Sequence, residues 1–165
     1  MAKTAEQSQP SQPQAGDMAP AIDLPTDGEG RFSLAACKGK HHVVIYFYPK
    51  DDTPGCTTES KDFRDHMDEF KKANTLVVGI SKDSIVSHDK FKDKHCLPFA
   101  LASDEEGDVC ERYGVWTEKN MYGKKYMGIQ RATFLIGKDG NIAKSWPKVS
   151  VEGHVKEVLE AAKAL

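Results

Sequence analysis

Two short apolar runs mark the centre of the chain, at residues 43–48 and 76–80. Both are rich in β-branched or aromatic side chains on the two alternating faces, which is typical of strands buried on both sides of a sheet. Between them, small or apolar side chains recur at helical spacing, at Cys56, Ser60, Phe63, Met67 and Phe70. A strand, an amphipathic helix and a second buried strand predict a βαβ crossover with parallel strands.

The flanking patterns predict further elements around this unit. Residues 19–34 contain a Gly-rich turn between two short apolar segments and predict an N-terminal hairpin. Residues 131–146 predict a second hairpin around the turn at 137–140. Three helices are expected: residues 84–95, opened by Asp83 or Ser84, residues 105–113, and a closing helix over residues 151–165. The set predicts an α/β domain whose central mixed sheet is flanked by helices.

The length of 165 residues fits one domain. Residues 1–17, rich in Gln, Ser, Pro and Ala, predict a flexible tail that precedes a domain over residues 18–165. The tail lacks the apolar stretch of a secretory signal. The longest apolar run is far short of the ~20 residues that a membrane helix needs. We therefore expect a cytoplasmic protein that does not bind membranes.

Composition removes several classes of function. The chain is 39% hydrophobic and 29% charged, with a formal net charge of -2. This balance is typical of a globular protein and gives no attraction to nucleic acid or anionic lipid. The basic and aromatic residues between 119 and 126 are interpreted as a solvated loop near the candidate site. The six histidines show no metal-ligand spacing, so they predict surface positions and no metal site.

The four cysteines have no C-x-x-C pair and none of the density of a secreted disulfide scaffold. Free thiols in a reducing compartment are the default interpretation. Cys37 and Cys110 are predicted to be buried packing residues. Cys56 and Cys96 require separate arguments.

Cys56 has the surroundings of a reactive thiol. Thr53 suits the N-cap position and Pro54 the first helical position, which places Cys56 in the first turn. Unpaired backbone NH groups and the helix dipole there favour the thiolate.

The helix end alone is too weak to activate the thiol. It supplies typically ~0.3 to 1 kcal/mol, whereas a change of one pKa unit corresponds to about 1.4 kcal/mol. Asp51 and Asp52 oppose a negative charge nearby. A cation is therefore required, and we predict that Arg131, at the start of the second hairpin, supplies it.

Residues 46–59 contain the pattern Pro-x-x-x-Thr-x-x-Cys and resemble the active-site segment of peroxiredoxins. The resemblance is greatest to the bacterioferritin-comigratory-protein or peroxiredoxin Q subfamily. Residues 109–116 and 123–131 are also similar to it, and the similarity extends roughly from residue 17 to the C-terminus.

The resemblance implies a thioredoxin-like fold and a peroxidase that reduces hydrogen peroxide and organic hydroperoxides without metal, haem or flavin. Transferred to this chain, Pro49 shields the thiolate, Thr53 hydrogen-bonds the peroxide, Cys56 attacks it and Arg131 stabilises the developing charge. Cys56 becomes a sulfenic acid, which another thiol must reduce. Thioredoxin is the expected donor, with glutaredoxin or glutathione as alternatives, and the expected state is a monomer or a weak homodimer.

The chain departs from the subfamily pattern at Lys61, where many members carry a second, resolving cysteine. Cys96, in a predicted loop after the helix that ends near His95, is one candidate resolver, and a one-cysteine cycle with an external thiol is the other. Two further functions stay open. A disulfide oxidoreductase would need C-x-x-C at the helix start, where Thr53 replaces the first cysteine. A non-catalytic binding or chaperone module on the same fold is the second.

Overall fold

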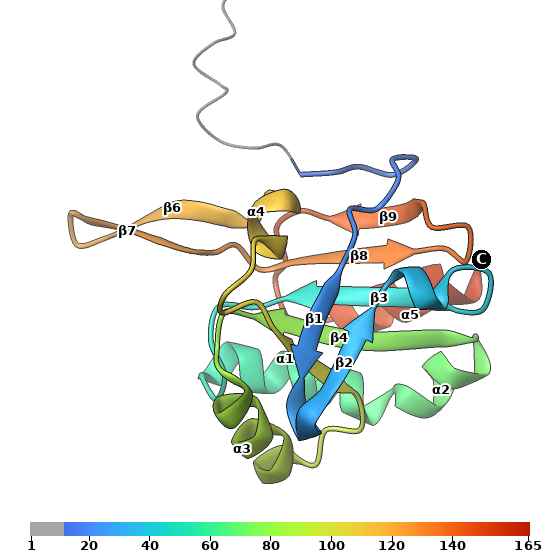
Figure 1. The fold of residues 1–165 in the computed structure, drawn as a ribbon, viewed down its shortest axis with the longest axis horizontal. Helices are drawn as coiled ribbons and strands as arrows, with labels where there is room; N and C mark the ends of the chain where they lie inside the picture. Colours follow the sequence, from blue (N-terminus) through green and yellow to red (C-terminus); the bar gives the residue numbers. More distant parts are fainter. Residues whose placement is uncertain (1–11) are drawn as a thin grey trace, which may run out of the picture.

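The fold is described here from a computed structural model, for residues 12–165 (Figure 1). A seven-stranded sheet has the order β2-β1-β5-β4-β3-β8-β9, and β6 and β7 form a separate two-stranded sheet. The strands are β1 (Asp23–Thr26), β2 (Gly30–Ser33), β3 (His42–Phe47), β4 (Thr75–Ser81), β5 (Ala100–Ser103), β6 (Trp116–Met121), β7 (Lys124–Ile129), β8 (Ala132–Ile136) and β9 (Ile142–Trp146). The helices are α1 (Pro54–Asp65), α2 (Met67–Lys72), α3 (Ile85–His95), α4 (Val109–Arg112) and α5 (His154–Lys163), with short 3-10 turns at Asp27–Glu29 and Ala35–Cys37.

The predicted βαβ crossover is confirmed. β3 and β4 run parallel, with Val44 opposite Val77. The helical segment between them is divided into α1 and α2 at His66, which ends the first helix and begins the second. The side chains predicted to face the sheet, from Cys56 to Phe70, are buried.

Both predicted hairpins are confirmed. β1 pairs antiparallel with β2, and β8 pairs antiparallel with both β3 and β9. The helix over residues 84–95 is confirmed as α3, and Ser84 caps it by accepting a hydrogen bond from the backbone NH of Ser87 at 3.1 Å. The mixed sheet of the predicted α/β class is therefore present.

The structure differs from the sequence predictions at two helices and adds one strand. The predicted helix over residues 105–113 is reduced to the four residues of α4, because turns occupy the positions before it. The closing helix begins at His154, three residues later than predicted. Residues 100–103 form β5, a short strand that the pattern did not reveal and that pairs parallel with β4. These short segments take their conformation from packing and strand pairing rather than from periodicity.

The sheet carries a hydrophobic core on each face. Val44, Tyr46 and Tyr48 pack with side chains of α1, α2 and α5. Val43, Ile45 and Phe47 point to the opposite face and pack with the N-terminal hairpin and α4. This alternation buries β3 from Val43 to Phe47, so the loop that leads to α1 starts from a buried strand.

Residues 12–17 lie against the second hairpin. The backbone NH of Gly16 donates to the carbonyl of Ile142 at 2.8 Å, and the NH of Ile142 donates to the carbonyl of Asp17 at 2.8 Å. The rest of the predicted tail lies outside the described residues. Within residues 12–165, no helix combines the length and the apolar character needed to cross a membrane.

Candidate active site

The first turn of α1 holds the thiol of Cys56. After β3 the chain turns at Asp52, whose backbone is left-handed with φ 61°. Thr53 then occupies the N-cap position in an extended conformation, and Pro54 begins the helix. The Thr53 hydroxyl donates to the carbonyl of Lys50 at 2.8 Å, so its side chain stabilises the loop rather than the helix NH groups. Cys56 is only 1% exposed.

The guanidinium of Arg131 lies beside this thiol. Its Nη2 donates to Cys56 Sγ at 3.4 Å, across a sequence separation of 75 residues. The carbonyl of Arg131 accepts from the backbone NH of Val149 at 3.0 Å, which fixes the residue just before β8. A Cβ on Gly55 would lie 3.2 Å from Nη2, so the glycine leaves the space that the guanidinium occupies. The structure thus brings together the cysteine and the arginine that the sequence singled out.

Glu59 is a member of this cluster that the sequence analysis did not identify. It is fully buried, and its Oε1 accepts from Arg131 Nη1 at 2.7 Å. Burial raises the pKa of Glu59 to about 7, against the opposing effect of Arg131. Burial also disfavours the charge of Arg131, but Glu59 and Cys56 outweigh it and raise the arginine's pKa. One feature of the sequence could have indicated a buried role for Glu59: it is an acidic residue next to Ser60, on the apolar side of an amphipathic helix.

The two aspartates before the helix are both partnered. Asp51 accepts from His88 at 2.7 Å. Asp52 pairs with Lys94 at 2.9 Å, and the hydrogen bond from Lys94 lowers the pKa of Asp52. The predicted opposition of these carboxylates to a thiolate at Cys56 is therefore weakened by their cationic partners.

The other cysteines differ in exposure. Cys37 and Cys110 are buried, as predicted, and burial raises the pKa of both thiols. Cys96 is exposed and ends α3 in a left-handed conformation with φ 53°, in the loop predicted for it. All four cysteines carry free thiols. Pro49 is exposed and lies two residues after the end of β3.

The predicted surface position is wrong for two of the histidines. His88 and His154 are buried, because each ring finds polar partners inside the fold. His154 Nε2 lies 2.8 Å from the hydroxyl of Thr133, and burial lowers the pKa of His154 to about 4. The contact of His154 with Thr133 and that of His88 with Asp51 both join segments far apart in the chain, so local sequence does not reveal them.

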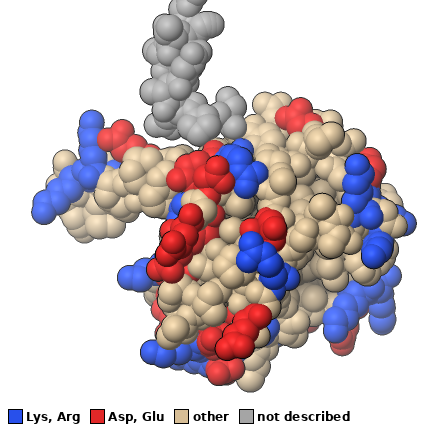
Figure 2. Space-filling model, in the orientation of Figure 1, with Lys and Arg blue, Asp and Glu red and all other residues tan. Residues whose placement is uncertain are grey.

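The solvated loop predicted around residues 119–126 is instead the β6–β7 hairpin, which projects from the domain (Figure 1). Figure 2 shows basic side chains along this projection. Tyr122 at its turn is 99% exposed. Lys119, on β6, is half-buried, and burial and the charge of Arg131 lower its pKa while Cys56 opposes this effect. The hairpin therefore borders the candidate site.

A buried thiol at the start of a helix, beside a guanidinium and without a second cysteine in the same turn, is an arrangement typical of thiol-dependent redox proteins. The family model AhpC/TSA matches residues 15–145. The chain therefore belongs to the AhpC/TSA family and is a thiol-dependent peroxidase of the Bcp or peroxiredoxin Q type, as its relatives indicate.

Relatives match the chain over nearly its whole length. It is 54% identical to the putative peroxiredoxin Bcp of Coxiella burnetii over 146 residues, which covers 88% of this chain and 96% of that protein. Identity to the peroxiredoxin Bcp of Bacillus subtilis is 48%, covering 90% and 94%. Among solved structures, Xanthomonas campestris peroxiredoxin Q superposes with a TM-score of 0.85 at 45% identity, covering 91% of this chain and 97% of that one. The predicted thioredoxin-like fold is thus confirmed.

Proposed function

We propose that Cys56 is the nucleophile with which this peroxidase reduces hydrogen peroxide and organic hydroperoxides. The contact of 3.4 Å between Cys56 Sγ and Arg131 Nη2 carries the proposal, because it places a permanent cation on a thiol at a helix N-terminus. A solved structure of the Xanthomonas campestris bacterioferritin comigratory protein, 44% identical to this chain, gives insight into the alkyl peroxide reduction activity of that protein.

In the proposed reaction the Cys56 thiolate attacks one peroxide oxygen. An S–O bond forms while the O–O bond breaks, and the leaving oxygen takes a proton to become water or an alcohol. Sulfur is oxidised to sulfenic acid and the peroxide is reduced by two electrons. Arg131 stabilises the negative charge that moves from sulfur to the leaving oxygen.

Three neighbours complete the proposed site. Glu59 accepts a hydrogen bond from Nη1 of Arg131. The other terminal nitrogen, Nη2, therefore stays directed at the sulfur of Cys56. Thr53 donates to the bound peroxide once its hydroxyl leaves the carbonyl of Lys50. Pro49, which follows the buried β3, covers the thiolate when the peroxide is bound.

A second thiol condenses with the sulfenic acid, with release of water and formation of a disulfide, and a further thiol donor must then reduce that disulfide. We propose Cys96 for this step, because it is exposed whereas Cys37 and Cys110 are buried. The end of α3 is also joined to α1, since Arg64 Nη1 donates to the carbonyl of His95 at 2.9 Å. A thioredoxin, or else glutaredoxin or glutathione, then reduces the disulfide. A one-cysteine cycle, in which the external thiol attacks directly, is the alternative.

Peroxide consumption with a thiol donor tests the nucleophile. We expect Cys56→Ser to reduce consumption to the uncatalysed background, because a serine hydroxyl is not ionised at neutral pH. Cys37→Ser is the matched control and keeps wild-type turnover, since Cys37 lies outside the site. Turnover by Cys56→Ser equal to that of the wild type would refute the proposal.

Disulfide mapping separates the two recycling routes. One equivalent of peroxide should produce a Cys56–Cys96 disulfide, detectable by mass spectrometry of the non-reduced digest, together with a monomer on a sizing column. A stable sulfenic acid at Cys56 with no disulfide would instead establish the one-cysteine cycle. A Cys56 disulfide to Cys37 or Cys110 would contradict both.

A further inference from the structure

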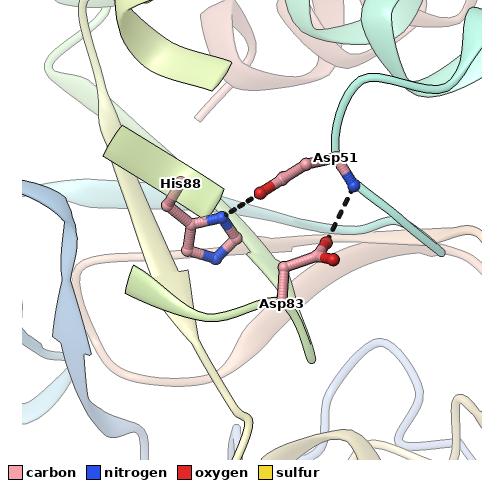
Figure 3. A group of neighbouring side chains, drawn as sticks. All are labelled: Asp51, Asp83 and His88. Carbon is pink, nitrogen blue, oxygen red and sulfur yellow. Dashed lines mark hydrogen bonds and ion pairs between the residues drawn. The ribbon is translucent and has the colours of Figure 1, made fainter. Parts of the chain in front are cut away.

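A buried polar cluster lies behind the loop that leads to Cys56 (Figure 3). Asp51 comes from the loop after β3, Asp83 follows β4, and His88 belongs to α3. Figure 3 shows the His88 ring directed at the carboxylate of Asp51, and the carboxylate of Asp83 directed at the backbone nitrogen of Asp51. The two contacts measure 2.7 Å and 2.8 Å.

The partners of His88 determine its protonation. Nε2 lies 3.0 Å from the carbonyl oxygen of Ala102, which can only accept, so Nε2 carries a proton. Nδ1 lies 2.7 Å from the carboxylate of Asp51, which also accepts hydrogen bonds from other residues. Both ring nitrogens therefore donate, and the ring is an imidazolium. The atoms of Asp51, Asp83 and His88 lie within 4.8 Å of one another, but neither ring nitrogen offers a lone pair to a metal ion.

Asp51 is the residue through which this cluster binds the loop between β3 and α1. Besides the bond from His88, its carboxylate accepts from the hydroxyls of Tyr48 at 2.6 Å and Ser87 at 2.8 Å. Its backbone NH donates to Asp83. Side chain and main chain of Asp51 are therefore both fixed, and the cationic partner is the strongest of these donors.

The loop runs from Asp51 directly into the site. Asp52 makes the left-handed turn, Thr53 follows at the N-cap, and Cys56 lies one helical turn further on. A groove of about 510 Å³ is lined by both the loop and α3. The ion pair of Asp52 with Lys94 across this groove is partly exposed, so it contributes little to the stability of the loop. The buried bonds of Asp51 are thus the main attachment of this part of the loop to α3.

We propose that His88 is a positioning residue for peroxide reduction: its buried imidazolium, acting through Asp51, holds the loop that places Thr53 and the first turn of α1. The proposal rests on the proposed function of Cys56. His88 touches no reacting atom and acts through the loop alone.

The proposal has a consequence at alkaline pH. The charged groups that face the His88 ring are Asp51 and Asp83, while Ala102 supplies a carbonyl. Burial disfavours the charged ring, but the hydrogen bond and charge of Asp51 outweigh it and raise the pKa of His88 above its ordinary 6.5. As the pH rises through that elevated pKa, the ring loses a proton and the loop loses its charged anchor. The rate of peroxide reduction should then fall with a midpoint set by His88.

The experiment compares the wild type with His88→Gln, which keeps one donor but does not titrate, and with the control His66→Gln. The His66 ring is half-buried, and within residues 12–165 its one side-chain hydrogen-bond partner is the carbonyl of Asp62 on α1. The rate constant of Cys56 oxidation by hydrogen peroxide is measured by stopped flow across roughly pH 6 to 9. Nitrogen NMR of the His88 ring is followed over the same range.

We expect the NMR spectrum to show a doubly protonated His88 at neutral pH, and the wild-type rate to fall as that proton is lost. His88→Gln should lower the neutral-pH rate roughly tenfold, as for one lost hydrogen bond to a charged group, and should lose the alkaline fall. Asp51→Asn should reproduce both effects if His88→Gln does not fold, and His66→Gln should behave as the wild type. A neutral His88 at neutral pH, or an unchanged pH profile in His88→Gln, would overturn the proposal. Failure of the wild type to consume peroxide would instead refute the proposed function.

Discussion

At the scale of single residues, the site depends on how closely Arg131 approaches α1. Gly55 permits this approach, because a Cβ at that position would lie 3.2 Å from Arg131 Nη2. The guanidinium cannot retreat freely, since Glu59 holds its other nitrogen at 2.7 Å. The distance between sulfur and cation is therefore sensitive to one methyl group.

Gly55→Ala should displace the guanidinium by a few tenths of an ångström and slow peroxide reduction roughly tenfold. The second-order rate constant for hydrogen peroxide, measured at saturating reductant, tests this. Thr58→Ala, an exposed change on the same helix, is the matched control and should leave the rate unchanged. A wild-type rate in Gly55→Ala would mean that the contact with Arg131 does not limit the chemistry.

At the scale of elements, α1 is fixed to the sheet by a buried hydrogen bond of 2.8 Å between the hydroxyls of Tyr46, on β3, and Ser60. The Tyr46 ring lies over Gly79 of β4, where a Cβ would approach it to 2.8 Å. Phe63 stacks on the same ring with centroids 4.6 Å apart. The Tyr46 ring is thus packed tightly between α1 and β4.

Gly79→Ala should therefore lower the free energy of unfolding by about 1 to 3 kcal/mol, as expected for an overpacked core. Urea denaturation of the reduced protein measures the change. Asp68→Ala, on the exposed side of α2, should stay within about 0.5 kcal/mol of the wild type. An unchanged midpoint for Gly79→Ala would show that Tyr46 can move, and that α1 is held less rigidly than its contacts indicate.

At the scale of the whole molecule, two buried groups give the stability opposite dependences on pH. The folded state raises the pKa of Glu59 from 4.5 to about 7 and thus binds its proton more tightly than the unfolded chain. This contribution to stability is lost as the pH rises from 4.5 to about 7. The pKa of His154 is lowered from 6.5 to about 4, so its contribution is lost as the pH falls from 6.5 to about 4.

Single variants should separate these effects. Glu59→Gln should remove the loss on the alkaline side, so its stability relative to the wild type increases between about pH 5 and pH 7. His154→Gln should remove the acid loss and gain relative stability as the pH falls. Chemical denaturation at a series of pH values measures both. Parallel curves for the wild type and Glu59→Gln would show that Glu59 keeps its ordinary pKa in the fold.

The elements whose signals are local could be predicted from the residues alone. The apolar runs gave β3 and β4, helical spacing gave the buried face from Cys56 to Phe70, and turn residues located both hairpins. Thr53 and Pro54 fixed the helix start. These signals act within a few residues, so they can be read without knowledge of the rest of the chain. The motif around Cys56 added the family, and the need for a cation beside a reactive thiol pointed to Arg131.

Which distant groups meet, and which are removed from water, depends on how the whole chain packs. Glu59 reaches Arg131 across 72 residues, and Asp51 reaches His88 across 37. The burial of both histidines and the projection of the β6–β7 hairpin depend on packing against distant segments. The energies of these buried charges come from desolvation and long-range pairing. No local pattern of residues contains either quantity.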